Sequence, residues 1–329
     1  MGPAIRALST RAARVTLLCG PRGEAAARLL PRVDEVVVFH APWIDPQPDP
    51  VTREAVLALA DELARRAIDE AVVFTSFHQS ALPTALVLRL AGVPTIAAIS
   101  DDYPGSLLDV RHHAPDDVHE VERALSLVAA LGYDLAPGDD GRLAVDRPYR
   151  EERSPAGDGS YIVVHPGASA PARAWAAGRN AALVEALVER GHRVVVTGTA
   201  AERELTAAVA GSRSANVLDL GGRTDVAGLA EVLARADALV VGNTGPAHLA
   251  AAVGTPVVSL FAPVVPATRW RPWRVPHELL GDQDAPCKDS RARVCPVPGH
   301  PCLNDVSVDD VVAAVERLAR ARDSEPVLA

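Results

Sequence analysis

The sequence predicts an α/β protein of two consecutive domains, each with a parallel β-sheet covered by helices. Short Val-rich apolar runs alternate with helical segments along most of the chain. The composition is 48% hydrophobic but only 4% aromatic, which is typical of small-residue helices packed on buried parallel strands. A stretch rich in Gly, Pro, Asp and Arg at residues 133–159 interrupts the alternation. We therefore predict domains at residues 1–150 and 151–329.

The expected elements follow from this alternation in both halves. In the first half, we expect strands at residues 14–19, 35–39, 71–74 and 95–99, and helices at 22–30, 52–66, 83–91 and 119–131. In the second half, we expect strands at 161–164, 193–197, 216–219, 238–241 and 257–260, and helices at 181–190, 202–210, 226–236 and 308–322. Right-handed crossovers make such strands parallel, so both domains are Rossmann-like and ligands are expected beyond the carboxyl ends of the strands.

Charge and hydropathy limit the classes of partner. The net charge is −9 and the Lys and Arg residues are dispersed, so we expect no nucleic-acid partner. No apolar segment approaches the ~20 residues needed to span a bilayer, and the start lacks a secretory apolar region. A cytoplasmic protein with at most peripheral membrane contact is expected.

The most informative stretch is residues 238–260. An apolar strand is followed by the turn Gly242-Asn243-Thr244-Gly245, and Pro246 suits the first position of a helix. The exposed amides and partial positive charge of that helix end attract an anion. Asn243, Thr244 and His248 add directional hydrogen bonds, so a nucleotide diphosphate fits.

Other loops of the second half follow strands that end at the same sheet edge. Arg173 supplies the positive charge that stabilises a departing diphosphate. Glycines permit close backbone approach, and hydroxyl groups bind phosphate or ribose oxygens. The residues expected to bind the nucleotide are His165, Gly167, Thr197, Gly198, Gly222 and Thr224. The alternatives are structural roles for His165 and His248, and a solvated helix position for Arg173.

In the first half, polar residues follow two predicted strands. His78 and Gln79 follow one strand and Asp101 follows the next, so they are candidate contacts for an acceptor. A helix cap and a solvated acidic loop are the competing interpretations.

Three of the four cysteines lie in one loop near a histidine. Cys287, Cys295, His300 and Cys302 offer three sulfurs and one nitrogen, a set that could bind zinc. No C-x2-C pair is present, which favours reduced thiols, and we expect no metal and no cofactor.

The motifs together resemble one known family. They are HPGASAPARAW (165–175), TGTAAE (197–202), the segment 220–261 with GNTGPAH, and PAIRAL (3–8). The chain resembles glycosyltransferase family 9, the ADP-heptose:lipopolysaccharide heptosyltransferase-like enzymes, which have the GT-B fold of two Rossmann-like domains facing a cleft. The resemblance implies a nucleotide diphosphate sugar donor, a glycan or glycolipid acceptor, and inversion without a metal. By motif, Arg173 matches the family's phosphate-contacting basic residue, and Asn243, Thr244, Gly245 and His248 match its D/N-T-G-x-x-H turn.

The resemblance departs from the family at the amino terminus. Family members begin with a strand and a Gly-Asp turn that lead into the PAIRAL helix, whereas this sequence starts inside that helix. We therefore expect the first strand of the N-terminal domain to be missing, the family's general-base aspartate to be absent, and the catalytic base to be unassigned.

Two functions follow from the resemblance. The first is an inverting, metal-independent transfer of a heptose-like sugar to a glycan, glycolipid or natural-product acceptor, as in lipopolysaccharide core biosynthesis. The alternative is a catalytically inactive GT-B protein that binds sugar nucleotides or acts as a scaffold. A sugar-nucleotide epimerase shares the two-domain plan.

Overall fold

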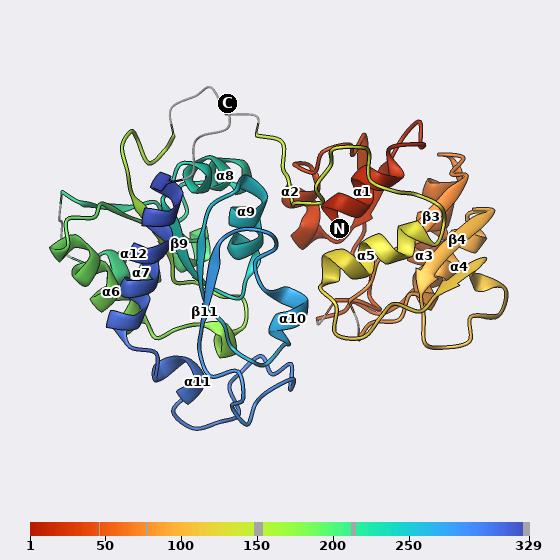
Figure 1. Cartoon of the computed structure of the whole chain (residues 1–329). Coiled ribbons are helices and arrows are strands. Elements are labelled where there is room, and N and C mark those ends of the chain that lie inside the picture. Colours follow the sequence, from red (N-terminus) through yellow and green to blue (C-terminus); the bar gives the residue numbers. More distant parts are fainter. Residues whose placement is uncertain (46, 77, 148–153, 212–214, 325–329) are drawn as a thin grey trace. The chain divides into compact units, whose positions relative to one another are not determined.

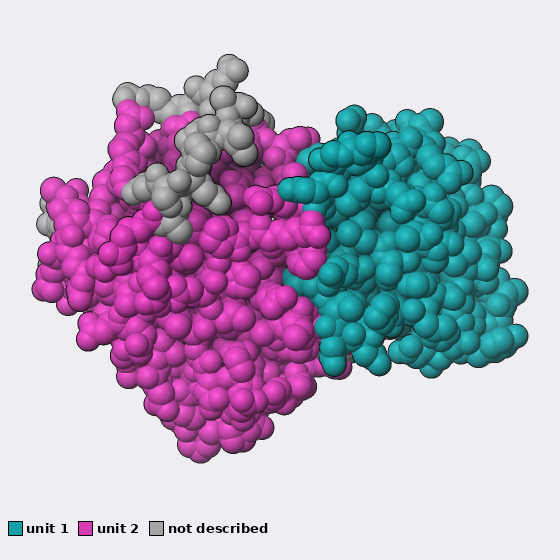
Figure 2. Space-filling view, in the orientation of Figure 1, with its two compact units in different colours: residues 1–141 teal, residues 142–329 magenta. Residues whose placement is uncertain are grey.

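The computed structural model describes residues 1–45, 47–76, 78–147, 154–211 and 215–324, with side chains to residue 320. The chain divides into two compact units, Met1–Gly141 and Arg142–Ala329 (Figure 2). The linker predicted near residue 150 falls on residues 148–153, which lie outside the described residues. Each unit has its own parallel β-structure and its own hydrophobic core.

The described residues of unit 1 form five strands in two parallel sheets. They are β1 (Thr16–Cys19), β2 (Glu35–Val38), β3 (Glu70–Val73), β4 (Thr95–Ile99) and β5 (Val110–His112). The sheets have the orders β1-β2 and β3-β4-β5, and no described strand pairs with both β1 and β3. Strand β5 was predicted as loop, because three residues carry no periodicity and the strand is defined by its pairing with β4.

Helices cover both faces of the β3-β4-β5 sheet. The helices of unit 1 are α1 (Gly2–Leu8), α2 (Glu24–Ala27), α3 (Arg53–Ala64), α4 (Leu82–Leu90) and α5 (Glu120–Ala129). Helix α3 begins after Thr52, whose hydroxyl accepts from the Ala55 amide, and buries Leu59 and Leu63 one turn apart. Helices α3 and α4 share a core with Ile96, while α1 and α5 pack together on the opposite face (Figure 1).

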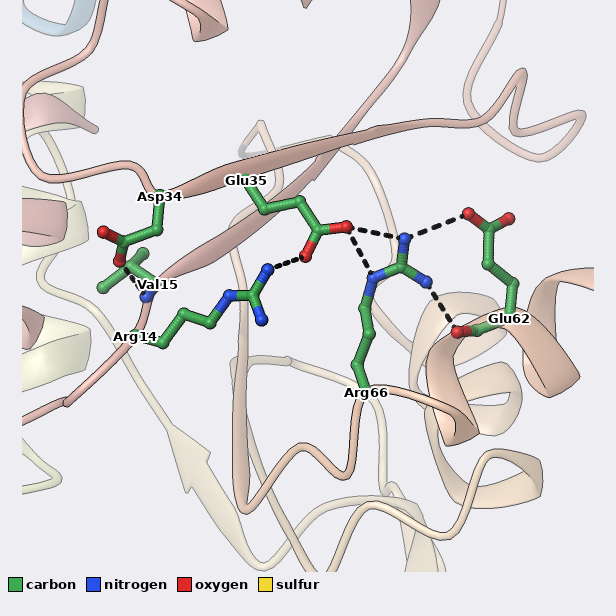
Figure 3. A network of polar contacts seen from close by, with 6 residues as sticks. All are labelled: Arg14, Val15, Asp34, Glu35, Glu62 and Arg66. Carbon is green, nitrogen blue, oxygen red and sulfur yellow. Dashed lines mark hydrogen bonds and ion pairs between the residues drawn. The ribbon is translucent and has the colours of Figure 1, made fainter.

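A polar network joins the two-stranded sheet to helix α3 (Figure 3). Glu35, at the start of β2, accepts from Arg14 Nη2 at 2.8 Å and from Arg66 Nε and Nη2 at 3.1 and 2.8 Å. Arg66 also donates to the Glu62 carbonyl at 2.6 Å. The hydrogen bond from Arg66 is the main cause that lowers the pKa of Glu35. The network lies at the amino ends of the strands, away from the edge where ligands bind in such sheets.

Unit 2 contains one six-stranded parallel sheet of order β11-β10-β9-β6-β7-β8. The strands are β6 (Ile162–His165), β7 (Val194–Val196), β8 (Val217–Asp219), β9 (Ala238–Gly242), β10 (Val257–Leu260) and β11 (His277–Leu280). Strand β11 was not predicted; its HELL sequence is short and only half-buried, and pairing with β10 defines it. All other strands predicted in this half are confirmed to within a few residues.

Alternate side chains of these strands enter two separate cores. The helices are α6 (Ala177–Glu189), α7 (Arg203–Ala210), α8 (Val226–Ala234), α9 (Gly245–Val253), α10 (Ala267–Trp270), α11 (Pro301–Asn304) and α12 (Val308–Ser324). Val164 and Val240 pack with α6, α7 and α12, whereas Val163 and Val241 pack with α8 and α9 (Figure 1). Within the described ranges no helix is both long and apolar enough to cross a membrane.

Candidate functional site

The strand order of unit 2 gathers most of the predicted residues along one sheet edge. Because β10, β9, β6, β7 and β8 are consecutive and parallel, the loops after their carboxyl ends are neighbours. The loop after β6, residues 166–176, lies at the centre of this series. The candidate site therefore has two parts, one on each side of that loop.

The first part joins the loop after β6 to the end of β9. Residues Pro171–Arg173 form the 3₁₀ turn η3, and the Arg173 carbonyl oxygen occupies the space in which a Cβ on Gly242 would lie. Only glycine permits this approach. Arg173 therefore lies directly beside the turn that begins with Asn243, as the sequence predicted.

Arg173 carries a cation to which no carboxylate of the described residues supplies a counter-charge. Its side chain is half-buried, and its Nε atom is buried with no hydrogen-bond partner among the described residues. Burial, and secondarily the charge of Arg293, lower the pKa of the Arg173 guanidinium. A buried N–H donor without a partner is costly, and a bound anion would supply that partner.

The beginning of helix α9 follows the turn after β9 and completes this part of the site. No side chain caps the helix, and Thr244 and Gly245 stand at its first positions. The ring of His248, in the first turn, lies edge-on to Trp270 of α10 with 6.2 Å between centroids. The arrangement leaves the helix end with its partial positive charge next to Arg173.

Asn243 has a structural role that the sequence did not reveal. Its side chain is buried, accepts from the Ala262 amide at 3.3 Å and donates to the Ala262 carbonyl at 3.4 Å. These two bonds hold the loop after β10 against the turn after β9. The Asn243 amide therefore positions the site, and its direct bond to an anion stays a prediction.

On the other side of the β6 loop, His165 and Thr197 face each other. His165 ends β6, Thr197 follows β7, and the His165 Nδ1 and Thr197 Oγ1 atoms lie 3.0 Å apart. Both side chains are buried. Burial lowers the pKa of His165, with Glu202 acting weakly in the opposite sense, so the ring is neutral near pH 7. The pair joins the end of β6 to the first residue after β7. This contact is a structural role for His165, one of the alternatives considered for that residue.

Three predicted glycines converge on the first turns after β7. A Cβ on Gly167 would overlap the Glu202 carboxylate, and a Cβ on Gly198 would meet the Thr206 methyl group. Gly222 has a φ of +64° and donates to the Gly198 carbonyl at 2.8 Å. The missing side chains thus let the loops after β6, β7 and β8 pack closely together, and a direct contact of these glycines with a ligand stays a prediction.

Glu202 was missed as a site residue, although it lies in the TGTAAE segment. Its Oε2 accepts from the Thr199 amide at 2.7 Å and from the Thr199 hydroxyl at 2.8 Å. This is a capping box, and the T-x-x-E spacing was the available signal. Thr224, the remaining predicted residue on this side, lies half-buried beside Gly228 at the start of α8.

The predicted acceptor residues lie in unit 1, after β3 and β4. His78 is exposed, while Gln79 folds back, accepting from the Ser76 amide at 3.2 Å. Asp101 is exposed, and its carbonyl accepts from Arg111 Nη2 at 2.6 Å. The strands β3 and β4 are neighbours, so these loops share one edge. Gln79 thus stabilises its own turn, a role that neither the acceptor hypothesis nor the helix-cap interpretation had given it.

The cysteine loop packs as free thiols. Cys287 and Cys302 are buried in the main core of unit 2, and Cys295 is half-buried against it. Burial and the neighbouring thiols Cys287 and Cys295 raise the pKa of Cys302 to about 12. His300 is engaged elsewhere, because its Nε2 donates to the Ala172 carbonyl at 3.1 Å. Within the described part of the chain, no three His, Cys, Asp or Glu side chains are arranged to hold a metal ion, so the geometry offers the zinc alternative no ligand set.

Comparison with known proteins gives a consistent family. The sequence profile of glycosyltransferase family 9 (heptosyltransferase) matches residues 56–300. Lipopolysaccharide heptosyltransferase 3 of Escherichia coli is 31% identical over 208 residues, 60% of this chain and 59% of that protein. Lipopolysaccharide heptosyltransferase 1 of Pseudomonas aeruginosa is 33% identical over 225 residues, 66% and 61% of the two chains. The matched part thus spans about 60% of the length of these relatives.

Solved structures agree in fold over nearly the whole chain. ADP-heptose lipopolysaccharide heptosyltransferase II of E. coli has a TM-score of 0.72 at 20% identity, covering 98% of this chain and 95% of that one. A family 9 glycosyl transferase from Veillonella parvula has a TM-score of 0.75 at 17% identity, covering 97% and 92%. These likenesses confirm the predicted fold class of two Rossmann-like units, the GT-B fold. With the profile covering residues 56–300, the chain belongs to glycosyltransferase family 9, the heptosyltransferases.

Proposed function

We propose that the protein is an inverting, metal-independent glycosyltransferase that transfers a heptose-like sugar from a nucleotide diphosphate sugar. Family membership supports the class of reaction. The observation that carries the proposal is Arg173, a half-buried residue whose Nε atom has no partner among the described residues and whose backbone lies against Gly242, at the turn that leads into the uncapped start of α9. Such an arrangement suits the charge of a departing diphosphate.

In the proposed reaction, an acceptor hydroxyl oxygen forms a bond to the anomeric carbon on the face opposite the diphosphate. The bond from that carbon to the diphosphate oxygen breaks, and the hydroxyl proton passes to a base. Negative charge grows on the leaving diphosphate as this bond breaks. Arg173 and the amides at the start of α9 stabilise that charge, so no divalent metal is required for this step.

The nucleoside is proposed to lie on the other side of the β6 loop. Gly198 and Gly222 pack closely against Thr206, Arg203 and Ala200, which brings the loops after β7 and β8 together. Thr224 lies in the same loop after β8, and its hydroxyl group is proposed to bind the nucleoside. The Glu202 carboxylate can accept hydrogen bonds from ribose hydroxyls, as acidic residues do in dinucleotide-binding folds of this class. This assignment adds Glu202 to the residues predicted from the sequence.

The acceptor is proposed to be a glycan or glycolipid that contacts the loops after β3 and β4, including His78 and Asp101. Both side chains are exposed at the carboxyl edge of the three-stranded sheet. A nucleotide sugar donor suits the predicted cytoplasmic location, with at most peripheral contact of the protein with a membrane.

The decisive experiment has two stages. A thermal-shift screen with ADP, UDP, GDP and their sugars identifies the nucleotide, since a ligand at 100-fold its dissociation constant adds about 2.7 kcal/mol of stability. Transfer to lipopolysaccharide core acceptors is then followed by mass spectrometry with and without EDTA, and the anomeric configuration by NMR. We expect an EDTA-resistant, inverted product. Binding without turnover favours the non-catalytic alternative, and no nucleotide binding overturns both.

A further inference from the structure

The loop that contains the cysteines is fixed to the candidate site by backbone contacts. The Ala172 amide donates to the Arg293 carbonyl at 2.9 Å, and His300 donates to the Ala172 carbonyl. The Arg291 amide donates to the Val264 carbonyl at 2.8 Å, in the loop after β10. Residues 291–300 therefore contact the loops after both β6 and β10, the two strands that flank β9.

The ends of this segment are anchored in the core. Cys287 and Cys302 are each 2% exposed and belong to the main hydrophobic cluster of unit 2. The segment between Cys287 and Cys302 is therefore held at both ends by the core and near its middle by the bond between Arg293 and Ala172 of η3. These contacts fix the position of its backbone. Arg293 is the residue at the middle contact, and its side chain is exposed.

The Arg293 side chain lies against the loop that carries Arg173. Its Nη2 donates to the Ser169 carbonyl at 3.1 Å, in the same loop that carries Arg173. The charge of Arg293 acts on Arg173 to lower its pKa, and no carboxylate of the described residues offsets that effect. Two cations thus converge on one loop, and the buried Nε of Arg173 has no partner. Two cations on one loop favour a ligand that offers phosphate oxygens to both of them, and a diphosphate has more such oxygens, spread over a greater length, than a monophosphate.

We propose that Arg293 is a second anion-binding residue and that, with Arg173, it makes the site selective for a diphosphate over a monophosphate. The inference rests on the proposed function, in which the ligand is a nucleotide diphosphate. Arg293 can bind an anion and keep its hydrogen bond to the Ser169 carbonyl, because a guanidinium has five donors and the observed bond uses one. The remaining donors are available to phosphate oxygens that Arg173 does not reach.

The test measures the affinities of ADP and AMP for the full chain by isothermal titration calorimetry. Arg293→Gln keeps a donor for the Ser169 carbonyl and removes the charge. We expect it to weaken ADP binding by about 10-fold to 100-fold, the loss expected for a charge-assisted hydrogen bond. AMP binding is expected to fall much less, so the ratio of the two affinities decreases. Arg293→Lys keeps the charge and is expected to retain most of that ratio.

The matched control is Arg291→Gln, the same change at an exposed arginine two residues away, which is expected to preserve the ratio. Thermal unfolding verifies that each variant is folded. An unchanged ratio in Arg293→Gln, or an equal loss for ADP and AMP, overturns the inference, because a purely structural clamp would affect both ligands alike. If Arg293→Gln does not fold, Arg293→Lys decides. A loss of the ratio of the two affinities in that variant overturns the inference, because the charge is still present. Failure of the wild-type chain to bind any nucleoside diphosphate would instead overturn the proposed function.

Discussion

The backbone of Arg173 lies against Gly242, with the Arg173 carbonyl oxygen in the space that any larger residue at 242 would need. The contact joins the loop after β6 to the last residue of β9, two adjacent strands of the sheet. It thereby places Arg173 beside the turn that leads into α9. The proposed phosphate site depends on this single approach between two backbones.

Gly242→Ala tests that dependence. The added methyl group collides with a backbone atom, which cannot move without shifting η3, so we expect a loss of about 1–3 kcal/mol of stability and at least a tenfold loss of ADP affinity. Chemical denaturation and calorimetry measure the two effects. The control is Gly178→Ala near the start of α6, where nothing lies within 4 Å of the new methyl group. Wild-type ADP affinity in Gly242→Ala would contradict the proposed site.

Replacing Arg173 separates binding from stability. Arg173→Met removes a partly buried cation whose Nε has no partner, so the melting temperature is expected to stay or rise while ADP affinity falls by about 10-fold to 100-fold. Arg179→Met is the matched control, because Arg179 donates to the Val306 carbonyl. That variant is expected to lose about 1 kcal/mol of stability and to keep ADP affinity. A strongly destabilised Arg173→Met would contradict the assignment of an unpaired cation.

His165 is expected to contribute to the change of folding stability with pH. Burial lowers its pKa in the folded chain below the value of about 6.5 in the unfolded chain. The unfolded chain therefore takes up the proton first, so this contribution is complete above pH 6.5 and is lost as pH falls. In His165→Gln, the decrease in urea midpoint between pH 7.5 and 5.5 is expected to be smaller than in the wild type. Equal decreases in the two proteins would show that His165 is not the responsible group.

The cysteines are expected to react in a defined order. Cys302 has a pKa of about 12 and is buried with Cys287, so at pH 8 almost none of it is thiolate. Treatment of the native protein with iodoacetamide is expected to modify the half-buried Cys295 before Cys287 or Cys302. Peptide mass spectrometry identifies which cysteines are modified, and protein unfolded in urea provides the control in which all cysteines react. Rapid labelling of Cys302 in native protein would contradict the packing described.

The sequence predicted the alternation of strands and helices because short Val-rich apolar runs alternate regularly with amphipathic helical segments. It missed β5 and β11, which are three and four residues long and are defined only by pairing with a neighbouring strand. It also missed Glu202 as a site residue. That carboxylate enters the site only because the loop after β6 passes over the first turn after β7.

By itself, the sequence determined the two-unit α/β plan, the glycine turn before α9 and the loops expected to meet at one edge, because these depend on local spacing and residue type. Only the tertiary structure decided that Asn243 bonds to Ala262 and that Arg293 is near Arg173. Those relationships join segments distant in the chain. Their physical cause is the order of the strands in the sheet and the core packing of the cysteine loop, neither of which has a local signal in the sequence.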